Sequence, residues 1–287
     1  MGSPLVSAIV LTYRSPKDTL ACVRALLGQT LGDAIEVIVV DNHSDTDSIG
    51  ILRTQLPKDP RIRLVETKRN LCYGKGNNFG VRYATGEYLL IINPDNMMPS
   101  EALQKLALKM EKDPTIGILA PKLVFPSGTV RDSARAFPSF FDVFIKRTAL
   151  RHLFPGRIAA YTQQGSRGTQ SGGRGIARNA PTSPREVDWI AGACLLLRRS
   201  FFNELQGFDP RFFLFFEDID LCRRTWAAGK RVVYDPTITV ADREHRLSEG
   251  GVLTLLTKKT VWWHLASAVK YFWKWRGKPH TRIETHC

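Results

Sequence analysis

Short apolar runs alternate with a helical pattern at the start of the chain. Residues 6–12 and 35–40 are β-branched runs, and apolar residues over 18–27, between them, recur at helical spacing. Strands that are apolar at nearly every position are typical of a parallel sheet covered on both faces. The pattern therefore predicts a β–α–β unit in a parallel sheet.

The same alternation continues to about residue 120. We expect, in chain order, a strand at 61–65, a helix at 77–84, a strand at 87–92 and a helix at 100–112. Ser100 is the expected N-cap of the last helix, and Asp113-Pro114 ends it. The first 120 residues are thus predicted to form one α/β unit.

The composition changes in the middle of the chain. Residues 162–185 are rich in Gly, Ser, Gln, Pro and Arg and contain no acid, so we expect a mobile loop there. After it we expect ordered chain at 187–197, a turn at 207–210, a helix at 217–228 and a strand at 231–234. Residues 1–250 are therefore assigned to one domain and 251–287 to a C-terminal tail.

The charge is strongly positive, with 41 Lys and Arg against 27 Asp and Glu, a net +14. Such a charge requires a polyanionic partner, which is nucleic acid, an anionic membrane surface or a phosphorylated substrate. Seven basic residues and no acid lie in 258–282, together with four of the six tryptophans. A basic, Trp-rich amphipathic helix suits an anionic membrane surface. The alternative is a helix docked on the domain with a solvated basic face.

Several other classes of protein are not expected. Nucleic-acid binding is one of them, because the sequence contains no helix-turn-helix, zinc-finger or RNP-type pattern. No apolar run reaches the roughly 18–20 residues that span a bilayer. The N-terminus lacks a secretory pattern, and the five scattered cysteines favour a reducing compartment. We therefore expect a cytoplasmic protein, peripheral to the inner face of the cell membrane.

Polar residues follow two of the predicted strands, where open α/β sheets bind ligands. Asp41 follows the second strand and is suited to accept hydrogen bonds from a ribose or a base. Asp95 follows the strand at 87–92, and a carboxylate there suits Mg²⁺ or Mn²⁺ shared with substrate phosphates. Each acid is also a common turn former.

A glycine-rich segment, RNLCYGKGNNFG, occupies residues 69–80. Its glycines allow close backbone approach, and Lys75 is suited to meet phosphate or ribose oxygens. The segment is not a dinucleotide fingerprint, since its spacing has one residue too many and the acidic strand end precedes the glycines. A nucleotide-dependent oxidoreductase is therefore disfavoured, and a purely structural loop remains an alternative.

Acidic residues follow the aromatic run at 212–216. Glu217, Asp218 and Asp220 are ordinary residues for the first turn of a helix, where the dipole favours acids. Beside apolar surface, however, the pKa of a carboxylate rises toward that of a general base. His245 is a candidate metal ligand, although a lone His is more often a surface residue.

In this order along the chain, the motifs resemble those of the family-2 glycosyltransferases, which have the GT-A fold and transfer a sugar from a nucleoside diphosphate with inversion. The matching segments are Thr12-Tyr13-Arg14, Asp41-Asn42, Asn70 with Gly74 to Gly80, Asn93-Pro94-Asp95, Trp189 with Gly192-Ala193, the acidic segment 217–223, and His245 with Ser248. The resemblance implies an α/β, Rossmann-like sheet of GT-A type that binds a nucleotide-sugar, with 1–250 as the catalytic domain.

The resemblance also implies a role for each position. The donor site would comprise Thr12, Tyr13, Arg14, Asp41, Asn70, Gly74, Lys75, Asn78 and Asn93. The acceptor side would comprise Trp189, Gly192 and Ala193. Asp95 and His245 would hold Mg²⁺ or Mn²⁺ at the diphosphate. Asp218 would be the base, with Glu217 as the alternative or as the residue that orients the acceptor hydroxyl.

The metal motif departs from the family's Asp-x-Asp, because its first position is Asn93. An Asn-Pro-Asp variant looks like rhamnosyltransferase-like members, which favours dTDP-rhamnose over a UDP-sugar as donor. No Gln-x-x-Arg-Trp string follows, so one sugar is expected per encounter. The expected acceptor is a glycan or lipid-linked glycan in cell-envelope polysaccharide synthesis, and the loop at 162–185 is expected to order over the donor. A non-catalytic protein that binds nucleotide or anionic lipid remains the alternative.

Overall fold

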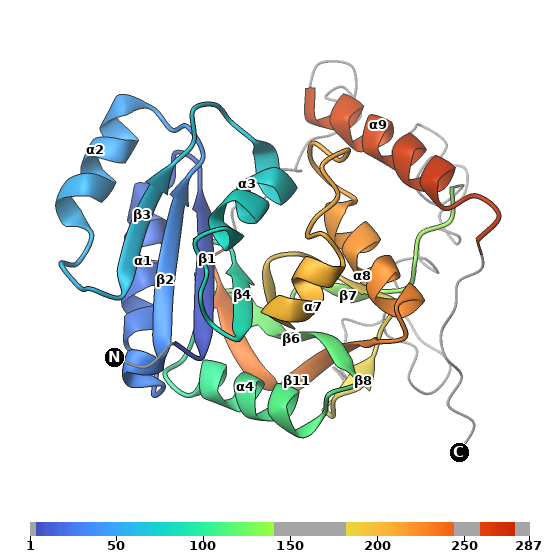
Figure 1. The fold of residues 1–287 in the computed structure, drawn as a ribbon, viewed down its shortest axis with the longest axis horizontal. Helices are drawn as coiled ribbons and strands as arrows, with labels where there is room; N and C mark the ends of the chain where they lie inside the picture. The colour runs from blue at the N-terminus through green and yellow to red at the C-terminus, as the bar shows by residue number, and fades with distance from the viewer. Residues whose placement is uncertain (1–3, 141–181, 244–258, 279–287) are drawn as a thin grey trace.

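The protein is built around a twisted mixed sheet flanked by helices, as the computed structural model shows for residues 4–140, 182–243 and 259–278 (Figure 1). Within these ranges the sheet has nine strands in the order β3-β2-β1-β4-β10-β6-β11-β5, with β8 paired to β11. The loop predicted at 162–185 lies outside the described residues except for 182–185, and His245 also lies outside them.

The amino-terminal half alternates strands and helices, as the apolar pattern predicts. Its elements are β1 (Val6–Thr12), α1 (Pro16–Leu27), the short 3-10 helix η1 (Gly32–Ala34), β2 (Ile35–Asp41), α2 (Thr46–Gln55), β3 (Ile62–Glu66), α3 (Cys72–Val81) and β4 (Tyr88–Ile92). Strand β1 pairs in parallel with both β2 and β4, and β2 with β3. The carboxyl ends of these strands therefore meet at one edge of the sheet.

The remaining elements complete the sheet and cover it. They are β5 (Asn96–Met97), α4 (Ala102–Lys112), β6 (Ile116–Val124), β7 (Ala134–Arg135), β8 (Arg185–Glu186), β9 (Trp189–Ile190), β10 (Cys194–Arg198), α7 (Arg199–Glu204), α8 (Glu217–Ala227), β11 (Arg231–Asp242) and α9 (Lys259–Lys274). Strand β10 is antiparallel to β4 and β6, whereas β11 is parallel to β6. Strands β7 and β9 form a separate two-stranded sheet.

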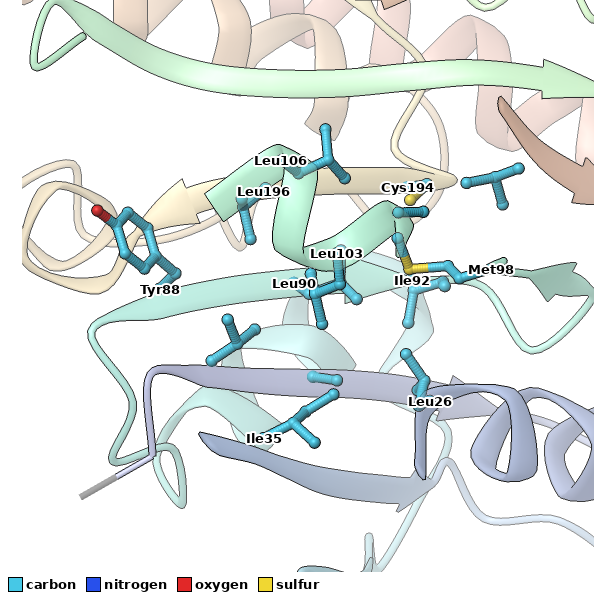
Figure 2. Packing of buried hydrophobic residues seen from close by; sticks show 14 of the residues in the cluster. Leu26, Ile35, Tyr88, Leu90, Ile92, Met98, Leu103, Leu106, Cys194 and Leu196 are labelled. Atoms are coloured by element: carbon cyan, nitrogen blue, oxygen red, sulfur yellow. The ribbon is translucent and has the colours of Figure 1, made fainter. Parts of the chain in front are cut away.

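Two apolar layers cover the sheet, one on each face. Helices α1 and α4 pack on one face, where Leu103 and Leu106 of α4 lie over Leu90 of β4 and Leu196 of β10 (Figure 2). Helices α7, α8 and α9 contribute to the layer on the other face, which includes the fully buried Tyr271. Burial on both faces explains why the central strands are apolar at nearly every position.

Three differences from the predicted element boundaries have causes that the local apolar pattern does not show, and other element ends shift by one to three residues. Helix α4 has Glu101 rather than Ser100 at its N-cap, and the Leu103 N–H donates to Gln29 Oε1 at 3.1 Å. A side chain 74 residues away thus satisfies the helix end. Strand β11 continues to Asp242 instead of ending at 234, because the register shift after Asp235 accommodates a proline in the strand. The third difference, the start of α3, is described with the site.

Helix α9 confirms that the tail contains a helix. The described helices all fall short of the length and apolar character that crossing a bilayer requires. In Figure 1, α9 lies at one end of the molecule beside α8, and α2 lies at the other end.

A glycine in α3 sets how closely that helix approaches the sheet. A Cβ added to Gly80 would lie 2.6 Å from Val40 Cγ2 and 2.7 Å from Ile9 Cγ2. We expect Gly80→Ala to lower the free energy of unfolding by about 1–3 kcal/mol, the usual cost of overpacking. Chemical denaturation measures the change, and Gly50→Ala is the matched control.

Gly50 lies within α2 and has no heavy atom within 4 Å of its added Cβ. Its replacement by Ala should be neutral or stabilising by up to about 1 kcal/mol, the difference in helix propensity. Equal unfolding free energies for the two variants would contradict the close approach of α3.

Candidate active site

The site forms at the edge where β1, β2 and β4 end. Thr12, the last residue of β1, is paired in register with Asp41, the last residue of β2. Strand β4 ends at Ile92, directly before the Asn93-Pro94-Asp95 motif. The topology thus brings together three motifs that are separated by tens of residues in the sequence.

Among the residues that the structure describes, Asp41 has a carboxylate oxygen that lacks a hydrogen-bonding partner. The side chain is buried, and its Oδ2 accepts a hydrogen bond from the Ser44 N–H at 3.0 Å. Its Oδ1 is buried and accepts none from the described part of the chain. Because a buried unsatisfied acceptor is costly, a ligand N–H or O–H at this point would be favourable. This geometry suits the nucleoside contact that the resemblance implies.

The three residues after β1 differ in exposure. Thr12 is buried and accepts a hydrogen bond from Thr19 Oγ1 at 2.8 Å. Tyr13 is 43% exposed, and the Arg14 guanidinium lies 5.1 Å from the centre of its ring. Arg14 also forms an ion pair with Asp45 at 3.3 Å. Tyr13 and Arg14 are therefore the residues of this segment that a ligand could contact, and Thr12 is part of the buried structure beneath the site.

Asn42 and Asn70 join the end of β2 to the start of α3. Asn42 Nδ2 donates to Asn70 Oδ1 at 3.1 Å, and the Leu71 N–H donates to Asn42 Oδ1 at 2.8 Å. The Cys72 N–H donates to Asn70 Oδ1 at 2.8 Å. These bonds cap α3, which explains why it begins at Cys72 rather than at 77 as predicted. Asn42 belongs to the matching Asp41-Asn42 segment, but no role was predicted for it.

Helix α3 packs closely on the segment that precedes α8. A Cβ at Gly74 would lie 3.0 Å from Phe208 Cβ and 3.5 Å from Glu217 Cβ. Asn78 uses both ends of its amide on the Phe208 backbone, at 2.7 and 2.9 Å. Gly74 and Asn78 therefore hold α3 against the acidic segment, while Lys75 is exposed.

Glu217 and Asp218 begin α8 as a pair of shielded carboxylates. Asp218 Oδ2 accepts a hydrogen bond from the Gly192 N–H at 3.1 Å, and its Oδ1 accepts one from the Ile219 N–H at 2.8 Å. Glu217 is only 5% exposed, and its Oε2 accepts no hydrogen bond within residues 4–140, 182–243 and 259–278. Burial and then the neighbouring Asp218 raise the pKa of Glu217 to about 8, and burial also raises the pKa of Asp218. Such a pair is suited to take up a proton near neutral pH.

Asp220, the third acid of the segment, has a different role. It is fully buried and forms ion pairs with Arg224 at 2.8 Å and Lys274 at 2.7 Å. Trp275 Nε1 donates to its Oδ1 at 2.9 Å. Asp220 therefore anchors α9 to α8.

A short turn connects the metal motif to the carboxylate pair. The Asn93 N–H donates to the Ala193 carbonyl at 2.8 Å, and Asn96 Nδ2 donates to the same oxygen at 2.9 Å. The preceding residue, Gly192, donates its N–H to Asp218, and its carbonyl accepts from the Tyr73 hydroxyl. The loop that carries Asp95 and the side chain of Asp218 thus flank one turn at 192–193.

Asp95 supplies a carboxylate just beyond the carboxyl end of β4, and carboxylates are a ligand type that divalent cations prefer. Asp95 is half-buried, and its backbone carbonyl accepts from the Arg243 N–H at 3.0 Å. Throughout the described ranges, no group of three or more His, Cys, Asp and Glu side chains is arranged to hold a metal. Since Mg²⁺ is commonly bound by one or two carboxylates with waters and phosphates, a single Asp beside Asn93 suits a cation delivered with the donor.

Trp189, which the resemblance places on the acceptor side, lies in β9 and pairs with the neighbouring strand β7. Trp189 is buried, its Nε1 donates to the Ala136 carbonyl at 2.8 Å, and the Arg135 guanidinium lies 5.7 Å from its ring centre. The positive charge of Arg135 opposes the rise in the pKa of Asp218, so this arginine lies within electrostatic reach of the pair. Sequence reasoning missed Arg135, because one arginine among 41 basic residues carries no signal.

The fold and the site together define a GT-A glycosyltransferase. The sheet has the required topology, acids follow two of its strands, and a carboxylate pair lies beyond a short turn. The chain belongs to the family described as glycosyl transferase family 2, whose sequence profile matches residues 7–205. The carboxylate pair lies beyond the matched segment. The predicted family and fold class are thereby confirmed, and the chain is a sugar-transferring enzyme rather than an oxidoreductase or a non-catalytic binding protein.

Curated relatives are similar over most of the chain. N-acetylglucosaminyl-diphospho-decaprenol L-rhamnosyltransferase of Mycobacterium tuberculosis is 30% identical over 249 residues, which cover 82% of this chain and 75% of that protein. The rhamnosyltransferase WbbL of Escherichia coli is 28% identical over 69% of each chain. The O-antigen biosynthesis protein RfbC of Myxococcus xanthus is 30% identical over 81% of this chain but only 17% of its own length.

Solved structures share the fold. The structure of GalNAc-T7 with UDP, GalNAc and Mn²⁺ has a TM-score of 0.58 at 15% identity, and it covers 97% of this chain. The structure of TarS of S. aureus has a TM-score of 0.54 at 17% identity, and it covers 83% of this chain. The chain spans 53% of the first structure and 36% of the second, so these similarities concern the fold alone.

Proposed function

We propose that the chain transfers one sugar, with rhamnose as the favoured candidate, from a nucleoside diphosphate to a hydroxyl of a lipid-linked glycan in cell-envelope polysaccharide synthesis. The observation that carries the proposal is the turn at 192–193, because the loop of Asp95 and the side chain of Asp218 lie on its two sides. A donor diphosphate bound at the Asp95 loop and an acceptor hydroxyl bound at Asp218 would then lie on either side of the anomeric carbon.

The proposed reaction inverts the anomeric centre. Asp218 takes the proton from the acceptor hydroxyl as that oxygen attacks the anomeric carbon from the face opposite the diphosphate. The bond from the anomeric carbon to the diphosphate oxygen breaks, and the diphosphate leaves with its electron pair. The Gly192 N–H and the Ile219 N–H hold the Asp218 carboxylate in place. Mg²⁺ or Mn²⁺ held by Asp95, when bound, supplies charge stabilisation for the departing diphosphate.

The donor site is proposed around the unsatisfied oxygen of Asp41. Tyr13 offers an exposed ring beside it for stacking on the base, and Arg14 and Lys75 offer positive charge for phosphates. Asn70 contributes by capping α3. The names of the M. tuberculosis and E. coli relatives favour rhamnose, and dTDP is the expected carrier.

Glu217 is proposed to stay protonated at neutral pH, so that the pair carries one negative charge. It then leaves Asp218 as the single base and is able to donate a hydrogen bond to the acceptor. With a pKa of about 8, Glu217 loses this proton at alkaline pH, where a second buried charge would appear beside Asp218. We therefore expect the rate of transfer to fall above about pH 8.

The same titration predicts a pH-dependent stability. The pKa of Glu217 rises from 4.5 to about 8 on folding, so the native state binds more protons than the unfolded state between these values. Stability contributed by this group is greatest at low pH and is lost as the pH rises toward 8. Glu217→Gln removes this ionisation. The melting temperature of the variant minus that of the wild type should therefore be larger at pH 8.5 than at pH 5.5.

The measurement is the melting temperature at the two pH values, where 1 kcal/mol corresponds to about 2–4 °C for a domain of this size. Glu204→Gln serves as the control, since Glu204 is exposed at the end of α7. The same difference between wild type and variant at both pH values would contradict the raised pKa.

The donor is tested by screening nucleotide-sugars for thermal stabilisation, with and without Mn²⁺. A ligand that binds only the native state raises its apparent stability. We expect dTDP-rhamnose to give the largest shift and UDP-sugars a smaller one. Product formation on a lipid-diphosphate acceptor then tests transfer directly. Absence of any nucleotide-sugar shift would reject the proposed donor site.

The proposed place of action is the cytoplasmic face of an anionic membrane, where lipid-linked glycans are accessible. The chain's net charge of +14 and the basic tail support this location.

A further inference from the structure

We propose that the outward face of α9 is a docking surface for an anionic lipid bilayer, formed by Trp262, Val269 and Trp273 with Lys270 and Arg276 beside them. We call it the α9 stripe. The surface is argued from the helix itself, and only its link to a lipid-linked acceptor rests on the proposed function.

The inner face of α9 is bound to the domain, which fixes what the outer face presents. Ala268 and Tyr271 are buried, and Ser267 Oγ donates to the Leu214 carbonyl at 2.9 Å. Lys274 Nζ forms ion pairs with Asp209 and Asp220, both at 2.7 Å. The helix is therefore a docked element with one orientation. The two readings of the tail, docked helix and membrane surface, are compatible because they concern opposite faces.

The outer face is apolar along its length. Trp262, Val269 and Trp273 are 62%, 58% and 68% exposed. Their spacings of seven and four residues place them in one row along a helix of 3.6 residues per turn. Beside this row, Phe213 and Trp263 form an exposed ring pair whose centres are 4.8 Å apart. Exposed tryptophans aligned in this way mark an interaction surface rather than scattered surface residues.

Charge identifies the partner as an anionic bilayer. Residues 259–278 contain no acid and four basic residues besides Lys274, which pairs with Asp209 and Asp220 on the inner face. The Arg276 guanidinium lies 3.8 Å from the centre of the Trp273 ring, and Lys270 is exposed on the same helix. Trp rings prefer the boundary between headgroups and acyl chains, and each nearby basic residue adds roughly 1 kcal/mol of attraction to anionic lipid. A second copy of the chain would bring like charges together, so charge complementarity favours lipid.

The α9 stripe is connected to the carboxylate pair through the inner face. His264 of α9 lies 5.1 Å from the Phe215 ring centre and 5.2 Å from that of Phe216. Phe216 is the N-cap of α8, directly before Glu217. A bilayer on the stripe would thus lie about one helix diameter, roughly 10 Å, from the loop that leads into the pair. This distance suits an acceptor that remains anchored in lipid while its sugar reaches Asp218.

The test is flotation of the full chain with vesicles of phosphatidylcholine, with and without phosphatidylglycerol. The variant is Trp262→Ala with Trp273→Ala, and the control is Leu108→Ala, which removes an exposed apolar side chain (45%) from α4. We expect wild type and control to float with the anionic vesicles and the variant to bind about tenfold more weakly. Arg276→Gln should weaken anionic binding without changing binding to neutral vesicles.

Three results would overturn the inference: equal flotation of wild type and variant, equal binding to neutral and anionic vesicles, or a wild-type dimer without vesicle binding that the variant abolishes. The last would assign the stripe to a second copy of the chain. Stabilisation by nucleotide-sugar is measured on each variant in parallel. Flotation of the wild type without stabilisation by any nucleotide-sugar would reject the proposed function and keep the docking surface. Stabilisation by a nucleotide-sugar without flotation would keep the proposed function and reject the docking surface.

Discussion

Asp218→Asn is expected to lower kcat by roughly 10²–10⁴-fold, the range that a positioned general base contributes. The amide cannot accept the acceptor proton. Its oxygen is still able to accept the Gly192 N–H that now binds Asp218 at 3.1 Å, while the Ile219 N–H faces the amide NH₂ and loses its acceptor. The free energy of unfolding should therefore fall by about 1–3 kcal/mol, and the donor affinity should change little. Rates of transfer at saturating donor, with the donor Kd measured separately, separate the two effects.

Two further variants sharpen this result. Glu217→Gln should retain most of the activity at neutral pH, because Glu217 is already protonated there. Asp47→Asn, which changes an exposed acid in α2, is the control for a general loss of charge. If Glu217→Gln were inactive and Asp218→Asn nearly normal, the base would be Glu217. Normal rates in both would remove the carboxylate pair from the mechanism.

Removing divalent cations should abolish transfer, and Mn²⁺ or Mg²⁺ should restore it. Asp95→Asn should then raise the cation concentration needed for half-maximal activity and reduce the rate by about 10²–10³-fold, comparable to the loss of other electrostatic stabilisers of a developing charge. Initial rates after chelation, with each cation added back in turn, measure the effect. The control is again Asp47→Asn, since Asp47 is exposed in α2 and lies outside the 93–96 loop.

Donor affinity with and without the cation distinguishes a phosphate-bound metal from a structural one. A cation shared with the diphosphate should strengthen donor binding and leave the stability of the ligand-free enzyme unchanged. Full activity after chelation would instead assign the diphosphate charge to basic side chains such as Arg14 and Lys75. That outcome would leave the proposed sugar transfer standing and would reject the proposed metal dependence.

Much of the fold follows from the sequence because the relevant forces are local. The strands β1, β2 and β4 are β-branched and buried on both faces, so their apolar runs are visible without any partner. Helix α2 was not predicted, because in its ten residues only Ile49 and Leu52 are buried apolar residues. The start of α3 was also missed, since its cap comes from Asn42, 30 residues earlier than Cys72.

The candidate site divides in the same way. The sequence by itself singled out Asp41, Asp95 and the acids at 217–220 as candidates, since acids after buried strands or aromatic runs stand out along the chain. The family resemblance, rather than this pattern, favoured Asp218 over Glu217 as the base. Only the tertiary structure decided that the turn at 192–193 joins the loop of Asp95 to the side chain of Asp218. It also decided that Asp220 is an anchor, because its partners Lys274 and Trp275 lie more than 50 residues away.

The tail gives the same result. Its sequence determined a basic helix rich in tryptophan, since composition and spacing are local properties. Only the tertiary structure decided that Trp275 binds Asp220 while Trp262 and Trp273 remain exposed. Which face of a helix is buried depends on the surface against which it packs, and that surface is built from residues far away in the chain.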